Sequence, residues 1–231
     1  MPQRLSMQTA VAVQTERLHQ TIAARTKRVY DHLAAVYPAS TFFFHSKAHK
    51  IALEMSGLQN GMKVLEVATG SGEMFRRLVR SNPAGHTCGV DLSPNMAART
   101  QAGARKKFPR SRLHCQAVDA RALPYRDGYF DSIFCCYLFE LLSTDDIYQT
   151  MEEMHRVLKP RGKLTAILIG QQAEFFNRAY LVAASLVPAF WGRQMDKSAP
   201  GILEATGFRV TQERLVRQGF YPSRILTAIK E

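Results

Sequence analysis

Between residue 63 and the end of the chain, apolar positions alternate between two kinds of spacing. Short apolar runs predict strands, and apolar residues three or four positions apart predict helices between most of these runs. Strands that alternate with helices indicate an α/β fold whose mostly parallel sheet is covered on both faces. The segments predicted as strands are Lys63–Ala68, His86–Asp91, Leu113–Val118, Asp131–Tyr137, Leu164–Gly170, Arg209–Leu215 and Ile225–Lys230, and those predicted as helices are Glu73–Ser81, Pro94–Lys107, Asp145–Leu158 and Ile202–Thr206.

The end of the chain departs from this alternation. The turn between the last two predicted strands, through Gly219 and Pro222, is too short for a helix, so these strands should pair as an antiparallel hairpin. The sequence therefore predicts a Rossmann-like, doubly wound sheet of seven strands that is mostly parallel and ends in an antiparallel hairpin.

Two regions lie outside this regular pattern. The first 36 residues look helical and mixed in polarity, residues 37–46 interrupt that pattern, and Lys47–Ser56 predicts a helix that Gly57 closes. We therefore expect an N-terminal helical segment or lid over residues 1–46 and a main domain over residues 47–231. Residues 171–198 are rich in aromatic and aliphatic side chains. We interpret them as an apolar insertion on the substrate side, with a packed subdomain or a dimer contact as the alternative.

The first predicted strand ends in very small residues. The stretch VLEVATGSGE, residues 64–73, passes from β-forming residues to Gly70 and Gly72, and a helical pattern follows. In an open parallel sheet, ligands bind beyond the carboxyl ends of the strands, where glycine gives access to bare backbone. We expect that a side chain at either glycine would enter the space of the ligand. The following helix would present free N–H groups to an anionic part of that ligand.

The second predicted strand ends in Asp91, an acid that can accept hydrogen bonds from both hydroxyl groups of a ribose. This feature also suits a nicotinamide dinucleotide. A dinucleotide-binding enzyme is expected to carry G-x-G-x-x-G, however, and Phe75 stands where the third glycine belongs. A bound pyrophosphate is therefore the less favoured interpretation.

The chain is basic, with 31 basic and 19 acidic residues and a formal net charge of +12. Such a balance favours anionic partners such as nucleic acid, anionic lipid or an acidic small molecule, although a solvated helix face is the simpler alternative. No acid occurs between Asp91 and Asp119, and we expect the basic residues of that stretch to act on the substrate side together with residues 171–198. These basic residues are Arg99, Arg105, Lys106, Lys107, Arg110 and Arg112.

The four cysteines form no C-x-x-C pair, so the sequence predicts buried free thiols in a reducing cytosol and no metal site. No apolar stretch is long enough to span a bilayer, and no signal peptide is visible. We therefore expect a cytoplasmic protein, which could contact the inner membrane surface peripherally.

Five segments, taken in order, resemble the class I S-adenosylmethionine-dependent methyltransferases. The resemblance covers about residues 47–231 and is closest to the quinone C-methyltransferases and phospholipid N-methyltransferases. This sequence has Ala68 where the family pattern E/D-x-G-x-G-x-G has its first glycine, and Glu140 where relatives often carry histidine. Alanine is the smallest possible change, so we expect the turn to survive. The five segments are Glu66-x-Ala68-x-Gly70-x-Gly72, GVDLS at 89–93, AVDARALPY at 117–125, YFDSIFCCYLFELL at 129–142 and LKPRGKL at 158–164.

The resemblance implies S-adenosylmethionine as the cofactor and a role for each residue of its seat. Glu66 would order backbone N–H groups and water around the methionine part, Asp91 would bind the ribose, and Leu92 would lie against the adenine. Asp119 and the backbone of Ala120 would read the adenine amino edge, with a simple turn aspartate as the alternative. The residues implied in cofactor binding are Tyr30, Glu66, Ala68, Thr69, Gly70, Gly72, Asp91, Leu92, Asp119, Ala120, Cys136 and Tyr137.

The N-terminal part offers further candidates with simpler alternatives. Tyr30 and Asp31 resemble a pair that relatives place over the cofactor, although an ordinary helix aromatic fits as well. Lys47 and His49 could face the carboxylate of the cofactor, but we favour a solvated helix face for both.

The implied reaction needs little chemical help from the protein. The sulfonium makes the methyl carbon electrophilic, so the protein mainly has to align a nucleophile and exclude water. Cys136 and Tyr137 should line the methionine end, and the candidates for a general base are Tyr137, Glu140 and His45.

The expected acceptor is small and hydrophobic or lipid-like, with peripheral contact to an anionic membrane. One alternative is a nucleic-acid methyltransferase that uses the basic surface, but nucleic acid is disfavoured because CCYL, residues 135–138, lacks a D/N-P-P-Y/F arrangement. A second alternative is a non-catalytic protein that binds S-adenosylmethionine. The sequence leaves the oligomeric state open.

Overall fold

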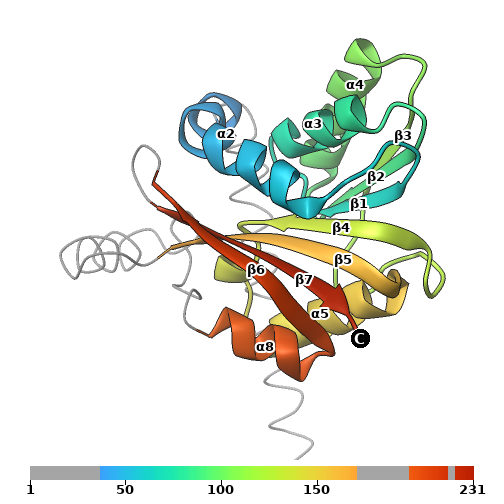
Figure 1. The fold of residues 1–231 in the computed structure, drawn as a ribbon. Coiled ribbons are helices and arrows are strands. Elements are labelled where there is room, and N and C mark those ends of the chain that lie inside the picture. Colours follow the sequence, from blue (N-terminus) through green and yellow to red (C-terminus); the bar gives the residue numbers. More distant parts are fainter. Residues whose placement is uncertain (1–36, 171–197, 218–221) are drawn as a thin grey trace, which may run out of the picture.

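The computed structural model describes residues 37–170, 198–217 and 222–231 (Figure 1). The expected helices before residue 37, with Tyr30, lie outside the described residues, as do residues 171–197 of the apolar insertion and Gly219 of the last turn. The described elements follow one another in the order that the sequence predicts. They are α2 (Tyr37–Ser56), β1 (Lys63–Val67), α3 (Glu73–Ser81), β2 (His86–Asp91), α4 (Pro94–Lys107), β3 (Arg112–Ala117), β4 (Phe130–Cys136), the 3-10 helix η1 (Phe139–Leu141), α5 (Thr144–Val157), β5 (Leu158–Ile169), α8 (Ala199–Ala205), β6 (Phe208–Val216) and β7 (Ser223–Lys230).

The strands form one seven-stranded sheet in the order β3-β2-β1-β4-β5-β7-β6. The first five strands of the chain pair in parallel, while β7 lies antiparallel to both β5 and β6. The predicted fold class, including the antiparallel hairpin at the end of the chain, is confirmed. Because the parallel strands point the same way, the segments that follow β1, β2, β4 and β5 all leave from one edge of the sheet.

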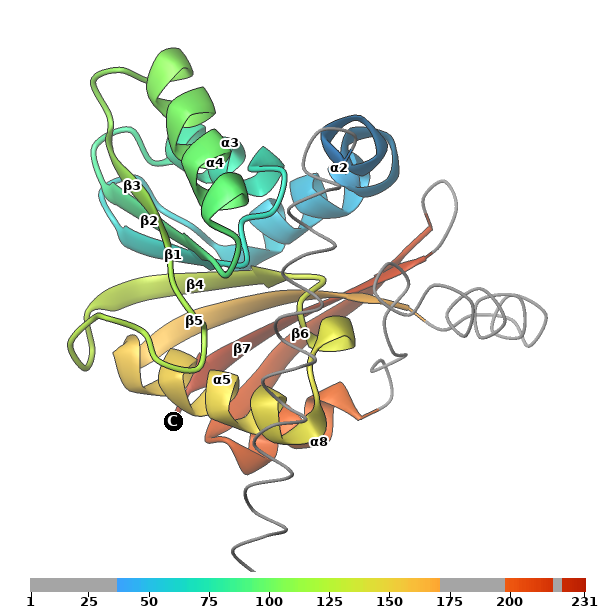
Figure 2. The same ribbon diagram turned by 180° about the vertical axis from the view of Figure 1, so that it is seen from behind.

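Helices cover both faces of the sheet, with α2, α3 and α4 on one face and α5 and α8 on the other (Figures 1 and 2). Helices α3, α4 and α5 each bury a set of side chains against the rest of the fold. On α5 the stripe of Ile147, Met151 and Met154 is fully buried. Among the described residues, no helix is both long and apolar enough to cross a membrane.

The largest differences from the predicted bounds are at the starts of α2 and β5, and smaller ones are at the starts of α8, at Ala199, and β7, at Ser223. The helix expected from Lys47 begins at Tyr37, because Pro38 falls in its first turn, where proline is tolerated. The strand expected from Leu164 begins at Leu158, because a bulge absorbs the extra residues: pairing jumps from Phe130 with Leu158 to Ser132 with Lys163. Helix α2 therefore spans the expected division at residues 46 and 47.

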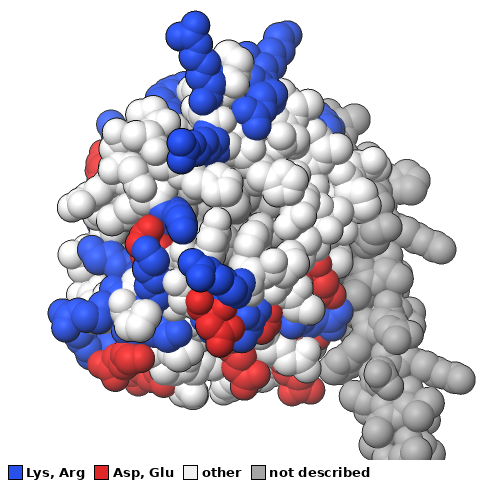
Figure 3. All heavy atoms as spheres, turned by 90° about the vertical axis from the view of Figure 1, so that its right-hand side faces the viewer, with Lys and Arg blue, Asp and Glu red and all other residues white. Residues whose placement is uncertain are grey.

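The basic stretch after Asp91 lies away from the carboxyl ends of the strands. Ser93 caps α4 directly after β2, and the helix then runs back along the sheet for 14 residues, about 21 Å. Its basic last turn therefore reaches the amino-terminal edge, which Figure 3 faces, with Lys and Arg side chains at the top over the end of α4. The guanidinium of Arg105 also binds the carbonyls of Pro109, Ser111 and Leu113. The expectation that the basic residues lie on the substrate side is therefore wrong for those from Arg105 to Arg112, while Arg99 lies in the first half of α4.

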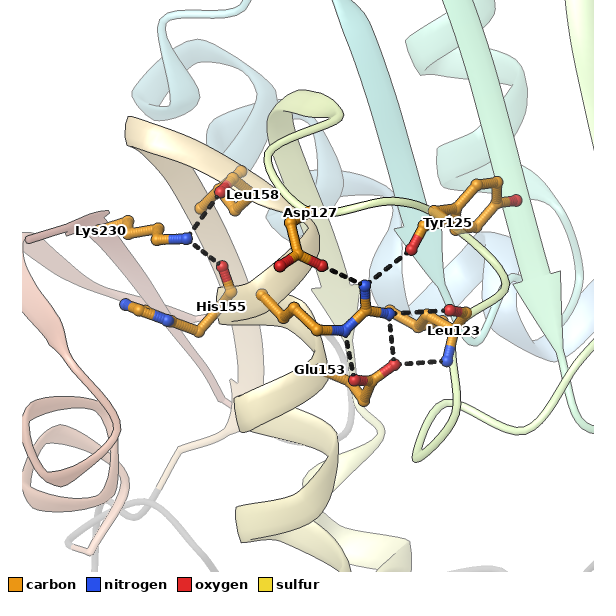
Figure 4. A network of polar contacts seen from close by, with 8 residues as sticks. Leu123, Tyr125, Asp127, Glu153, His155, Leu158 and Lys230 are labelled. Atoms are coloured by element: carbon orange, nitrogen blue, oxygen red, sulfur yellow. Dashed lines mark hydrogen bonds and ion pairs between the residues drawn. The ribbon is translucent and has the colours of Figure 1, made fainter.

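One arginine of α5 fixes the loop between β3 and β4 (Figure 4). Arg156 donates to the carbonyl oxygens of Leu123 and Tyr125 at 2.9 and 2.8 Å. It also forms ion pairs with Glu153 of its own helix and with Asp127 of the loop. Glu153 in turn accepts a hydrogen bond from the backbone N–H of Leu123 at 2.7 Å. Three of the five donors of this guanidinium group thus hold the loop against α5, and the other two bind Glu153 of α5 itself.

We predict that Arg156→Lys lowers the free energy of unfolding by about 2 kcal/mol, because lysine keeps the charge but cannot reach four acceptors at once. Urea unfolding measures the change. Arg209→Lys is the matched control: Arg209 pairs with Glu231 on the surface, both more than half exposed, and this exchange should change stability by less than about 0.5 kcal/mol. Equal losses in the two variants would contradict the role given to Arg156.

Candidate active site

The loop between β1 and α3 has an unusual backbone. Ala68, Gly70 and Gly72 all adopt left-handed conformations, with φ of 63°, 48° and 72°. The turn is closed by a hydrogen bond from the N–H of Gly72 to the carbonyl of Thr69 at 2.8 Å, and Thr69 binds β2 through the carbonyl of Val90. The turn survives with alanine at its first position, as expected, but that alanine adopts a conformation that normally belongs to glycine.

Gly72 is required for a reason that the sequence did not indicate. A Cβ atom at this position would lie 2.6 Å from the hydroxyl of Thr100 on α4. Thr100 also donates to the carbonyl of Gly70 at 3.4 Å. Gly72 therefore permits the close approach of α3 and α4, and the expectation that its side chain would meet the ligand stays a prediction.

Asp91 joins the ends of β1 and β2. One carboxylate oxygen accepts from the N–H of Gly70 at 2.7 Å, and the other accepts from the N–H of Ser93 at 2.9 Å. The sequence placed both residues at strand ends, and the structure brings them into contact. Next to this acid, the side chain of Leu92 is 39% exposed, a large fraction for a leucine at a strand end.

The carboxylate of Asp119, two residues after β3, already binds the side chain of a residue in its own turn. Both of its carboxylate oxygens accept from the guanidinium of Arg121, which also pairs with Asp146 of α5 at 2.7 Å. Burial alone would raise the pKa of Asp119, but the hydrogen bonds from Arg121 outweigh it and lower the pKa. These contacts agree with the alternative that Asp119 simply stabilises its own turn. Ala120 is partly buried against the core.

The end of β4 is tied to the strands beside it. Tyr137 is left-handed, with φ of 57°, and its hydroxyl lies 2.7 Å from the hydroxyl of Ser223 on β7. Burial raises the pKa of the Cys136 thiol well above its ordinary value of 9.0, so this side chain stays neutral. Glu140 is buried and accepts from the N–H of Ile169 at 2.6 Å. Two of the three candidates for a general base, Tyr137 and Glu140, therefore have partners within the fold. The third candidate, His45, belongs to α2.

A buried ion-pair cluster joins α2 to the start of α3. His49 is 4% exposed, and its Nδ1 lies 3.3 Å from Oε2 of Glu73. The other oxygen of Glu73 accepts from Arg77 at 2.8 Å, and Arg77 donates to Ser46 at 2.6 Å. The expected solvated face is correct for Lys47, which is exposed, and wrong for His49. Ala48 and Ala52, which are both buried, lie on the same helix as His49. These two small apolar residues were the feature of the sequence that could have indicated that His49 is buried as well.

The chain resembles known proteins over most of this framework. Residues 64–162 match a family model described as a methyltransferase domain. A 2-phytyl-1,4-naphtoquinone methyltransferase from Nostoc punctiforme is 31% identical over 163 residues, which are 66% of this chain and 70% of that protein. The chain belongs to the class I S-adenosylmethionine-dependent methyltransferases.

Two further comparisons agree with this assignment. A demethylmenaquinone methyltransferase from Staphylococcus aureus is 28% identical over 185 residues, 79% of this methyltransferase and 73% of that protein. The crystal structure of a methyltransferase from Aquifex aeolicus has the same fold, with a TM-score of 0.64 and 23% identity, and covers 90% of this chain and 98% of that one. The protein is an enzyme that uses S-adenosylmethionine as its methyl donor.

The environment of Glu66 fits a cationic cofactor. This residue ends β1 with 1% of its surface exposed, and its Oε2 has no hydrogen-bond partner among the described residues. Burial, and then the charge of Asp91, raise the pKa of Glu66 well above its ordinary value of 4.5. A buried carboxyl oxygen without a partner is costly unless a ligand supplies a donor or a positive charge. S-adenosylmethionine carries two cationic groups in its methionine part, and either would satisfy this requirement.

We predict that Ala68→Gly raises the free energy of unfolding by up to about 1 kcal/mol. A left-handed backbone costs alanine about 1–2 kcal/mol, and the added freedom of glycine in the unfolded chain removes only part of that gain. The control is Ala102→Gly on the exposed face of α4, which should lower stability by about 1 kcal/mol. Thermal or urea unfolding distinguishes the signs, and a loss in both variants would show that Ala68 is unstrained.

We predict that Glu66→Gln stabilises the cofactor-free enzyme increasingly as the pH rises. With its raised pKa, folded Glu66 holds a proton that the unfolded chain releases above about pH 4.5, so wild-type stability decreases with pH in this window. Glutamine binds no proton, so the gain should be absent near pH 4 and grow as the pH rises above the ordinary pKa of a glutamate. Urea unfolding across pH measures it. With Glu54→Gln, on the exposed face of α2, as the control, a gain that does not depend on pH would contradict the prediction.

Proposed function

We propose that this methyltransferase transfers the methyl group of S-adenosylmethionine to a small, hydrophobic, quinone-like acceptor. The proposal rests on the agreement between the two relatives, which are named for a phytyl-naphthoquinone and for demethylmenaquinone. The apolar composition of residues 171–198, which follow β5 in the chain, agrees with an acceptor of this kind. It also agrees with peripheral contact to an anionic membrane, where acceptors with long apolar tails reside.

In this proposal, the cofactor lies across the carboxyl ends of β1, β2 and β4. Asp91, which the N–H of Gly70 holds at the end of β2, binds the ribose hydroxyl groups, and the exposed Leu92 packs on the adenine. Glu66 faces the cationic methionine part, as its unsatisfied carboxyl oxygen suggests. Cys136 and Tyr137 line the same end.

The remaining assignments follow the same layout. Residues Ala68, Thr69, Gly70 and Gly72 form the turn beneath the cofactor. The adenine edge is read by the backbone of Ala120 more than by Asp119, whose carboxylate binds Arg121. Residues 1–46, with Tyr30, act as an N-terminal segment or lid for the methyltransferase domain of residues 47–231.

The chemistry of the proposed site is mainly positional. The sulfonium of S-adenosylmethionine supplies an electrophilic methyl group. The chain has to hold the acceptor in line with the methyl–sulfur bond and keep water out. Burial keeps the thiol of Cys136 neutral, which prevents it from competing with the acceptor as a nucleophile.

Two alternatives have less support. A nucleic-acid methyltransferase would need its basic surface beside the site, but the basic end of α4 lies at the opposite edge of the sheet. A non-catalytic S-adenosylmethionine-binding protein would conflict with the family assignment.

We predict that the enzyme methylates a reduced 2-prenyl-1,4-naphthoquinone when S-adenosylmethionine with a labelled methyl group is supplied. The label should enter the quinone, and presenting the acceptor in anionic vesicles should raise the rate more than presenting it in neutral vesicles. Vesicles of phosphatidylethanolamine without quinone and total RNA serve as rival acceptors. Labelling of either rival with no labelling of the quinol would overturn the proposed acceptor class, and equal rates in both kinds of vesicle would overturn the anionic membrane contact.

A further inference from the structure

The turn that follows β3 lies directly beside Asp91 at the carboxyl edge of the sheet. The N–H of Val118 donates to the carbonyl of Asp91 at 2.9 Å, which continues the pairing of β3 with β2 by one residue. The chain then turns at Asp119, whose carbonyl accepts from the N–H of Ala122 at 3.1 Å. Because the adenine is attached to the ribose that Asp91 binds in the proposed cofactor position, this turn borders the adenine end.

The guanidinium group of Arg121 links this turn to helix α5. Its Nη2 donates to Oδ2 of Asp119 at 2.7 Å, and its Nε donates to Oδ1 of the same carboxylate at 3.1 Å. On its other side, Nη1 donates to Oδ1 of Asp146 at 2.7 Å. An isolated surface ion pair contributes little, but a planar guanidinium that holds two carboxylates from separate elements also fixes their relative positions.

Asp146 is the fixed end of this link. Its side chain is 11% exposed, against 37% for Asp119. Ser143, which caps α5, donates from its hydroxyl to Oδ2 of Asp146 at 2.7 Å and accepts from the N–H of Asp146 at 3.1 Å. The dipole of the helix also favours an acid in its first turn. Helix α5 therefore provides the position to which Arg121 holds the turn.

The charge of Arg121 is directed at these two acids and has no partner to attract in the cofactor. S-adenosylmethionine carries its cationic groups in the methionine part, and its adenine is uncharged. Burial opposes the charged form of Asp119, but the hydrogen bonds from Arg121 outweigh it and lower the pKa of this carboxyl group. The role open to Arg121 is therefore to determine where the turn lies.

We propose that Arg121 is a positioning residue for cofactor recognition, which holds the turn of residues 119–122 where it distinguishes the adenine amino group. This inference rests on the proposed function, because the cofactor position given there brings the adenine to this turn. Without the guanidinium, the carboxylates of Asp119 and Asp146 would repel each other, and the more exposed turn would move away from α5. The adenine would then lose hydrogen bonds, while the methionine end, at β1 and β4, would keep its contacts.

Calorimetry with two product analogues tests the proposal without any methyl acceptor. The ligands are S-adenosylhomocysteine and S-inosylhomocysteine, in which an oxygen replaces the adenine amino group. The wild-type enzyme should prefer the first by about tenfold, the factor expected for one hydrogen bond. Arg121→Gln should weaken binding of S-adenosylhomocysteine about tenfold and of S-inosylhomocysteine by less than about twofold, so that the preference nearly disappears.

Further variants separate the position of the turn from the stability of the fold. Arg121→Lys keeps the charge but cannot hold two carboxylates in one plane, and Asp146→Asn removes the charge of the anchor, so both should lower the preference. The matched control is Arg126→Gln: Arg126 is an exposed arginine of the same loop, 5.6 Å from the ring centroid of Tyr129, and its loss should leave both affinities unchanged. A ratio of two affinities does not depend on the fraction of folded protein, so a loss of stability alone cannot change it.

The outcomes are distinct. Arg121→Gln with the wild-type preference, or with equal losses of affinity for both ligands, would overturn the proposal. If Arg121→Gln does not fold, the same result for Arg121→Lys and Asp146→Asn would overturn it. A wild-type enzyme that binds both ligands equally would contradict the proposed cofactor position, and the role of Arg121 with it. None of these results depends on the acceptor class, which the labelled quinol tests separately.

Discussion

The hydrogen bond from the N–H of Gly70 to the carboxylate of Asp91 is the interaction on which the site depends. It joins residues 21 positions apart and locks the left-handed turn after β1 to the end of β2. Without that acceptor, the backbone N–H of Gly70 would lose its partner, and the carboxylate of Asp91 would lose one of the contacts that orient it. The parallel pairing of β1 with β2 supplies this geometry, because it brings both carboxyl ends to the same level.

Stability and function are distributed unequally over the fold. The loop before β4 and the end of β7 are held by many polar contacts, although Nε2 of His155 has no hydrogen-bond partner: Arg156 binds four residues, and Lys230 donates to the carbonyls of His155 and Leu158 (Figure 4). At the opposite edge, Ala68 is left-handed and Glu66 is buried without a partner for one oxygen. Strain and unsatisfied polar atoms of this kind persist when the surrounding structure over-determines them, and they concentrate where ligands bind.

The sequence predicted the elements whose bounds depend on residues close together in the chain. Pro94 after a serine cap, and the apolar stripe of α5, gave helices whose bounds agree with the structure to within one residue. The misses came from tertiary contacts. The burial of His49 depends on an acid 24 positions later in the chain, and the partner of Gly72 is Thr100 on another helix. The bulge in β5 depends on β4. The local spacing of apolar residues carries no information about such neighbours, so the sequence could predict candidate site residues but not the contacts that these residues make in the fold.

The charge of the whole chain is a poor guide to the charge of its site. The chain carries +12, yet the edge that follows β1 and β2 gathers Glu66, Glu73 and Asp91. The raised pKa of Glu66 reflects burial first and then repulsion from the other two acids, opposed only by Arg76. Because the basic end of α4 is about 20 Å away, salt screens most of its influence on this edge. These acids are not a uniformly negative surface, because Glu73 pairs with Arg77 and the raised pKa of Glu66 favours its neutral form. The direction of α4 therefore matters mainly for the positive charge: the helix carries its basic last turn away from the edge at which it begins.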